Sequence, residues 1–161
     1  MELTQFKTVE QLAAAINSLT MKTEGARVYN DSNISINDDT KTVLTFNSES
    51  YDTNSIHDTV SNTQRLTCQT AGYYLAVANV AFDSDADGYR AVYIEHDTAG
   101  TIGLTRVNAA STGFVILQAV AFGKLDVDDY LSVWVRHTAG AALNVLYASD
   151  YSPVFAMHRI I

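Results

Sequence analysis

The sequence predicts an all-β antiparallel sandwich or barrel with one short helix in front of it. Three observations support this prediction: one helical pattern of apolar residues near the start of the chain, many short β-rich runs after it, and clusters of Asn, Asp, Ser, Thr and Gly between those runs. Strands at this spacing without intervening helices are typical of antiparallel sandwiches and barrels. The 161 residues, 47% of them hydrophobic, suffice for one domain with a sizeable core.

The helical pattern covers residues 3–19, where apolar side chains recur at spacings of three and four and no glycine or proline occurs. Part of it also fits the seam of a short coiled coil, which would consist of Val9, Leu12, Ile16 and Leu19. Two interpretations stay open for residues 1–25. They form a helix packed on its own domain or, as we favour, a stalk or attachment segment tied together by an oligomeric head at residues 26–161.

After this helix, the β-rich runs predict ten strands, separated by polar turns and without an internal repeat or linker. Their predicted ranges are 26–30, 42–47, 65–68, 72–83, 88–97, 101–107, 113–122, 129–137, 142–147 and 153–160.

The longest of these runs is apolar on both faces of the predicted strand. One face carries Tyr74, Ala76 and Ala78, and the other carries Tyr73, Leu75 and Val77. A strand of this kind has to be covered on both sides. We therefore expect a second sheet over one face and a neighbouring subunit over the other.

Charge and cysteine content exclude several classes of protein. The formal net charge of −8 argues against a nucleic-acid partner, because binding the phosphate backbone requires clustered Lys and Arg. The segment that opens at Met1 reads neither as a secretory signal nor as a transmembrane span, so membrane insertion is not expected. Cys68 is the only cysteine and cannot form an intrachain disulfide; we interpret it as a buried structural thiol.

Five islands of the sequence resemble a known family, the jelly-roll superfamily of the complement q-subunit globular head and tumour necrosis factor. They are Ala26–Asn30, Thr45–Asp52, Gly72–Tyr74, Asp128–Val135 and Tyr151–Met157. The resemblance spans residues 26–161 and is strongest with prokaryotic and bacteriophage members. The islands similar to those members are Ala26–Tyr29, His57–Thr59 and Ala71–Tyr74.

This resemblance implies a jelly roll that assembles as a tight homotrimer, without the collagen-like stalk of many vertebrate members. Ala76 and Ala78 stand where vertebrate members carry aromatic residues, and Asp128 replaces a usual glycine. These departures weaken the transfer of vertebrate ligands to this chain but not the transfer of the fold. Four aromatic residues are expected in the core or in trimer contacts: Tyr74, Phe82, Trp134 and Phe155.

An acidic loop is the one candidate for a metal ion in the sequence. Asp83, Asp85 and Asp87 alternate before Gly88, as in the first half of a calcium loop. The second half is missing, because Ile94 stands where a bidentate Glu would be required. A solvated acidic hairpin and a Ca²⁺ site both stay open; some members of the family bind calcium near the trimer apex.

No pattern in the sequence predicts catalysis. The four histidines and many serines show no Gly-x-Ser-x-Gly elbow, no His-x-x-x-His pair and no glycine-rich loop before a helix. We expect each histidine to be bonded locally. Arg90 and Arg136 are expected to pair with Asp residues across a subunit boundary.

These observations lead to a non-enzymatic, homotrimeric structural or binding module. We expect it in a bacteriophage virion, assembled in the host cytoplasm, as a head decoration, fibre or tail-associated protein that contacts capsid or tail proteins through its N-terminal segment. The alternative is a carbohydrate- or receptor-binding adhesin head on a bacterial or phage surface, with a cell-surface glycan as ligand. A Ca²⁺-dependent enzyme or sensor is a third hypothesis.

Overall fold

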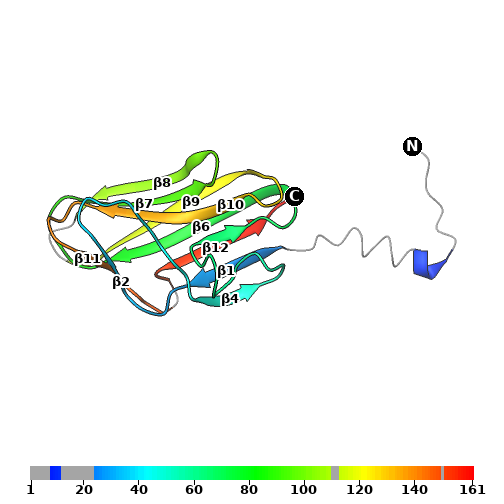
Figure 1. Cartoon of the computed structure of the whole chain (residues 1–161), viewed down its shortest axis with the longest axis horizontal. Coiled ribbons are helices and arrows are strands. Elements are labelled where there is room, and N and C mark those ends of the chain that lie inside the picture. Colours follow the sequence, from blue (N-terminus) through cyan, green and yellow to red (C-terminus); the bar gives the residue numbers. More distant parts are fainter. Residues whose placement is uncertain (1–7, 12–23, 110–112, 150) are drawn as a thin grey trace.

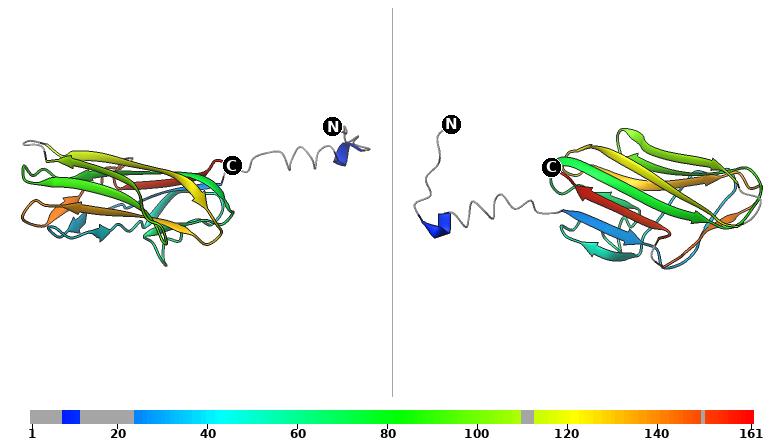
Figure 2. Two further views of the ribbon diagram at one scale, coloured as in Figure 1. Left: turned by 90° about the horizontal axis from the view of Figure 1, so that it is seen from above. Right: turned by 180° about the vertical axis from the view of Figure 1, so that it is seen from behind.

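The chain folds into two antiparallel β-sheets that pack face to face, as the ribbon in Figure 1 and the view from above in Figure 2 show. The computed structural model describes residues 8–11, 24–109, 113–149 and 151–161. The seven-stranded sheet contains β1 (Gly25–Tyr29), β2 (Ile34–Ile36), β4 (Ser48–Asp52), β6 (Gly72–Phe82), β9 (Val115–Leu125), β11 (Leu143–Val145) and β12 (Val154–Arg159). The five-stranded sheet contains β3 (Thr42–Val43), β5 (Arg65–Thr67), β7 (Tyr89–His96), β8 (Gly100–Asn108) and β10 (Tyr130–His137). This architecture confirms the predicted all-β sandwich.

Strand β6 organises the first sheet. It pairs along its whole length with β9, from Gly72 opposite Leu125 to Phe82 opposite Val115, and on its other side with β12 and β11. The first and last strands, β1 and β12, are neighbours, so the two ends of the described domain are held together within one sheet. Strand β9 is an edge of this sheet, and the Thr105 hydroxyl of β8 donates to its Gln118 carbonyl at 2.6 Å.

The core lies between the sheets and is built from the inward-facing residues of each strand. Three of the four aromatic residues singled out in the sequence are in it: Tyr74, Phe82 and Phe155 are at most 1% exposed. Trp134 is half-buried on the outer face of β10, where its Nε1–H donates to the Ser132 hydroxyl at 2.9 Å.

Most of the predicted strands are present within a few residues of their predicted ends. Residues 42–47 are a correction, since β3 is only Thr42–Val43 and the buried Leu44 and Phe46 follow in extended backbone outside any strand. The sequence analysis also missed β2 and β4. Strand β4 has the sequence SESYD, without apolar alternation, and forms because β1 supplies hydrogen-bonding partners.

The predicted N-terminal helix falls mostly outside the described residues. Within 8–11, one helical turn occurs at residues 9–11, and the Gln11 amide donates to the Thr8 hydroxyl at 3.1 Å. Val9 is 83% exposed. The other three seam residues, Leu12, Ile16 and Leu19, lie outside the described residues, so the stalk remains a prediction.

Candidate functional site

The outer face of β6 and β9 carries a group of apolar side chains, which we call the apolar surface. Leu75 lies opposite Phe122 and Val77 opposite Val120, and the hydrogen-bonded pair of Asn79 and Gln118 separates them from Ile116. The apolar surface consists of Tyr73, Leu75, Val77, Ile116, Val120 and Phe122. Phe122 is 63% exposed and Val120 is 50% exposed. Exposed apolar side chains that lie together over two paired strands are typical of surfaces that bind a partner.

The apolar surface follows from the same alternation that builds the core. Tyr74, Ala76 and Ala78 point inward and are at most 1% exposed, whereas Tyr73 and Leu75 point outward. This confirms that both faces of the strand are apolar and that one of them lies under the second sheet. The rings of Tyr73 and Phe122 stack at 5.8 Å between centroids, which holds two of the largest exposed side chains in a fixed arrangement.

A cavity of about 180 Å³ adjoins one end of the apolar surface. Its deep wall is formed by Tyr74, Leu125 and Leu131, and Phe122 shares the cavity with the apolar surface. His96 contributes an imidazole to this otherwise largely apolar lining.

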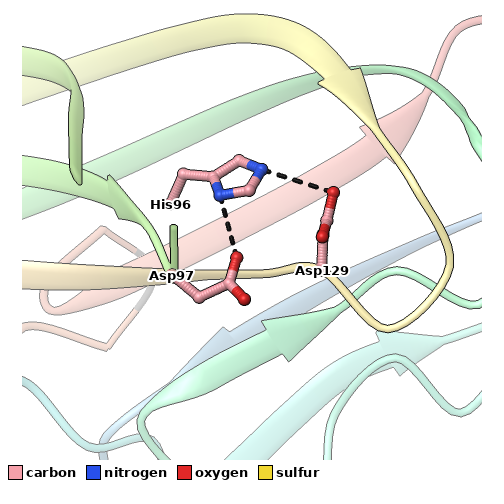
Figure 3. Close-up of side chains that lie close together, drawn as sticks. All are labelled: His96, Asp97 and Asp129. Carbon is pink, nitrogen blue, oxygen red and sulfur yellow. Dashed lines mark ion pairs between the residues drawn. The ribbon is translucent and has the colours of Figure 1, made fainter. Parts of the chain in front are cut away.

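His96 lies between two carboxylates, as Figure 3 shows. Its Nδ1 is 2.8 Å from Asp97 Oδ1, and its Nε2 is 3.4 Å from Asp129 Oδ2. The side chains are only 11%, 19% and 26% exposed for His96, Asp97 and Asp129, so the three groups are partly shielded from water. One atom from each residue can be chosen so that all three lie within 4.8 Å of one another.

The acidic loop proposed for calcium is organised by an arginine of the same chain. The guanidinium of Arg90 is fully buried and donates to the carbonyls of Asp85 and Asp87 at 3.0 and 2.8 Å. It also reaches Asp85 Oδ1 at 3.4 Å. The Asp83 carboxylate accepts the Ser84 amide at 2.7 Å. Calcium binding by Asp83, Asp85 and Asp87 stays a prediction.

The two arginines expected at a subunit boundary instead pair within the chain. Arg90 is buried against its own acidic loop, because alternation along β7 places it on the inward face with Val92 and Ile94. Arg136 donates from Nε and Nη2 to Asp39 Oδ1 at 3.0 and 2.6 Å, and this hydrogen bonding raises the pKa of the guanidinium. That expectation was wrong for both residues.

The other three histidines are bonded locally, as the sequence analysis expected. His57 Nδ1 is 2.9 Å from Glu49 Oε1, and His158 Nε2 is 2.5 Å from the Tyr51 hydroxyl. His137 is fully buried, and its Nε2 meets the Ile36 carbonyl at 3.0 Å. None of these contacts joins a histidine to a serine hydroxyl as in a catalytic triad.

Cys68 is a buried free cysteine, in agreement with the structural role that the sequence predicts. Its thiol donates to the Thr70 carbonyl at 3.2 Å. Burial raises the pKa of this thiol, which lowers the fraction present as the reactive thiolate.

The His96 cluster is the feature that the sequence analysis missed. The adjacent pair His96-Asp97 was visible, but Asp129 is distant in the chain and meets them only through the pairing of β7 with β10. The available signal was the acidic run Asp126–Asp129 placed just before a strand.

Within the described residues, no helix is both long and apolar enough to span a lipid bilayer.

Comparison with solved structures identifies the fold. Murine APRIL, in crystals at pH 5.0, aligns with 86% of this chain and 100% of its own at a TM-score of 0.67 and 11% identity. Eiger TNF from S. frugiperda aligns with 86% of this chain and 93% of its own at a TM-score of 0.61 and 15% identity. The fold is the TNF/C1q-like jelly roll.

The globular domain of zebrafish complement 1qA extends this likeness, with 84% of this chain and 93% of that chain aligned at a TM-score of 0.55 and 17% identity. Neither a family model nor a curated protein sequence matches the chain. The jelly roll expected from the resemblance is therefore confirmed at the level of the fold.

Proposed function

We propose that the chain assembles as a homotrimer through the apolar surface and acts as a non-enzymatic structural or binding module. The observation that supports this proposal is the exposed row of apolar side chains on β6 and β9, centred on Leu75, Val120 and Phe122. Burying such a row against a second copy removes apolar area from water, at about 25 cal/mol per Å². The three-fold order follows from the resemblance to the jelly-roll superfamily.

Light scattering on the full chain at micromolar concentration tests the assembly. We expect a mass of three chains for the wild type and of one chain for Phe122→Asp, because the charge would have to be buried in the contact. Val60→Asp is the matched control, since Val60 is 87% exposed and lies outside the apolar surface. A wild-type chain that stays folded and monomeric would contradict the proposal.

The proposed setting is a bacteriophage virion, in which the trimer serves as a head decoration, fibre or tail-associated protein. The resemblance of Ala26–Tyr29 and Ala71–Tyr74 to phage members supports this setting. Residues 1–25 would contact capsid or tail proteins. Mass spectrometry of gradient-purified particles, from cells that encode the chain, should find it at a fixed ratio to the capsid protein. Its absence from particles, combined with exposure on the bacterial surface, would favour the adhesin instead.

A glycan-binding adhesin head remains the second candidate because the loop that connects β4 to β5, together with β5, forms a polar cavity of about 190 Å³. Hydroxyl and amide groups line it, including those of Ser61, Asn62 and Gln69. Hydrogen-bonding groups in a concave site suit a sugar. A glycan array should show signal that is lost in Gln69→Ala and kept in Gln64→Ala, which changes a neighbouring residue outside the lining. An array without signal would exclude this candidate.

A further inference from the structure

The end of β7 and the start of β10 bring together three side chains that are far apart in the chain. Antiparallel pairing places His96 opposite Leu131, and the Asp97 amide donates to the Tyr130 carbonyl at 3.1 Å. Asp129 therefore sits beside the His96-Asp97 pair. The end of β7 and the start of β10 belong to the sheet framework, so these three side chains are positioned before any ligand binds.

The backbone and carboxylate of Asp129 are fixed on several sides. Its amide donates to the Asp126 carbonyl at 3.2 Å, and its carbonyl accepts the Cys68 amide at 2.8 Å. Its Oδ2 accepts the Asp126 amide at 2.8 Å. A carboxylate oxygen has two lone pairs, so Oδ2 keeps one that can bind a cation.

The two ring nitrogens of His96 have different surroundings. Nδ1 lies 2.8 Å from Asp97 Oδ1 and 3.2 Å from the Thr98 amide nitrogen. Nε2 faces Asp129 Oδ2 at 3.4 Å, and no hydrogen bond from the described residues reaches it. This separation is longer than the range of about 2.7–3.2 Å typical of N–H···O hydrogen bonds.

A distance of 3.4 Å between a nitrogen and an oxygen atom fits two ligands of one metal ion. With Zn–N near 2.0–2.1 Å and Zn–O near 2.0–2.2 Å, a tetrahedral angle places the two ligand atoms about 3.4 Å apart. His96 Nε2 and Asp129 Oδ2 have this spacing. We propose that they form a binding site for a borderline divalent transition metal such as Zn²⁺, with Asp97 as the carboxylate that positions the imidazole.

Asp97 supplies the contact that such a histidine needs on its other nitrogen. When a metal takes the Nε2 lone pair, the ring proton resides on Nδ1, where the carboxylate of Asp97 stabilises it. The Thr98 hydroxyl, 3.3 Å from Nδ1, can also accept from this proton. With the ring proton on Nδ1, the Nε2 lone pair is available to a metal ion.

The surroundings leave room for the remaining ligands. Both carboxylates are partly exposed, and the cavity beside the apolar surface reaches the His96 ring. Water can therefore complete the coordination. One imidazole with one carboxylate is a donor set for Zn²⁺, Co²⁺ or Ni²⁺, whereas Ca²⁺ takes six to eight oxygen ligands. The site is thus chemically distinct from the acidic loop that contains Asp83, Asp85 and Asp87.

Calorimetric titration of the full chain with ZnCl₂, repeated in excess CaCl₂, tests the proposal. We expect one Zn²⁺ per chain, no displacement by Ca²⁺, and loss of binding in His96→Gln. Asp129→Asn should weaken binding at least tenfold, and Asp97→Asn about 10–100-fold as a positioning residue. His158→Gln is the matched control, because His158 is bonded to Tyr51 elsewhere on the surface and its loss should leave the Zn²⁺ affinity unchanged.

Long-range ¹H–¹⁵N spectra of the wild-type chain give a readout that does not depend on how the variants fold. Zn²⁺ should shift the Nε2 signal of His96 while the signals of His57, His137 and His158 stay in place. A spectrum that does not change for His96, or binding that survives His96→Gln, would overturn the proposal. The cluster would then be an ion pair of an imidazolium with two carboxylates.

Discussion

The outer faces of the two sheets differ in what surrounds their large side chains. Both carry large aromatic or aliphatic side chains, but aromatic rings of the second sheet lie under cations of the same chain. Lys41 Nζ lies 4.5 Å from the centroid of Tyr93 and 5.6 Å from that of Trp134, and it also pairs with Glu95. The guanidinium of Arg106 lies 4.0 Å from the ring of Tyr89. We call the face formed by Tyr89, Tyr93, Glu95, Trp134 and Arg136 the cation-capped face.

The apolar surface on the first sheet has a different composition. Its aromatic pair, Tyr73 and Phe122, stacks ring on ring, and Leu75 and Val120 continue the row. The one lysine beside them, Lys124 opposite Tyr73, pairs with Asp126. The cation-capped face ends in hydrated charges and suits solvent. The apolar surface suits a protein partner, so the contrast between the two faces indicates where another copy would bind.

The largest expected effect is on the mass of the particle in solution, and one substitution on each face tests it. Val120→Asp should reduce the mass of the particle in solution from three chains to one, because the carboxylate would be desolvated in the contact. Leu104→Asp is the counterpart on β8, next to Tyr93 on the cation-capped face, and it should leave the mass unchanged. The two wild-type side chains are 50% and 54% exposed, which makes them a matched pair for light scattering.

The opposite result, loss of the trimer in Leu104→Asp and not in Val120→Asp, would place the contact on the second sheet. The roles assigned to the two faces would then be reversed.

The sequence predicted the core strands better than the edges and the His96 cluster, for a physical reason. Alternation is a local property, so the inward and outward sets of β6 can be separated from the order of its residues alone. Strand β4 has no such signal, because its polar residues pair with β1 only once both strands are in place. The contact of His96 with Asp129 depends on the register of β7 with β10, which local sequence does not determine.

Adjacent residues on β6 should affect different properties. Tyr74→Ala should lower the free energy of unfolding by about 3 kcal/mol or more, because it leaves a hole in the core. Tyr74→Phe should cost about 1 kcal/mol, since only the hydroxyl that donates to the Thr70 carbonyl is lost. Urea unfolding at one fixed protein concentration measures both. Neither change should alter the mass of the folded particle, whereas Leu75→Asp should; dissociation of folded Tyr74→Phe would contradict this division.

A smaller effect is expected on the cation-capped face. Lys41→Ala removes the cation over Tyr93 and Trp134 together with the ion pair to Glu95. Partly exposed interactions of these kinds contribute little, so the free energy of unfolding should fall by about 1 kcal/mol with the mass unchanged. Lys41→Arg keeps the charge and should retain most of the stability. If Lys41→Ala instead causes self-association, the cation is what keeps this face in solvent. The difference between the cation-capped face and the apolar surface would then depend on that one charge.

The smallest effect concerns Asp58, in the loop between β4 and β5 and outside both faces. Its carboxylate accepts the amides of Ser61 and Val60 at 3.0 and 2.8 Å, and these hydrogen bonds lower its pKa below the ordinary value of 3.8. A carboxyl whose pKa is lowered by folding stabilises the protein above its unfolded pKa and loses that contribution as the pH falls through the folded value. Asp58→Asn should therefore be slightly less stable than the wild type at pH 7, and the difference should shrink as the pH falls below 3.8. Urea midpoints measured across this range, with mass measured in parallel, give the test. A gap that widens toward acid would show that the amide bonds do not favour the ionised carboxylate, and a change in mass would show that this loop takes part in assembly.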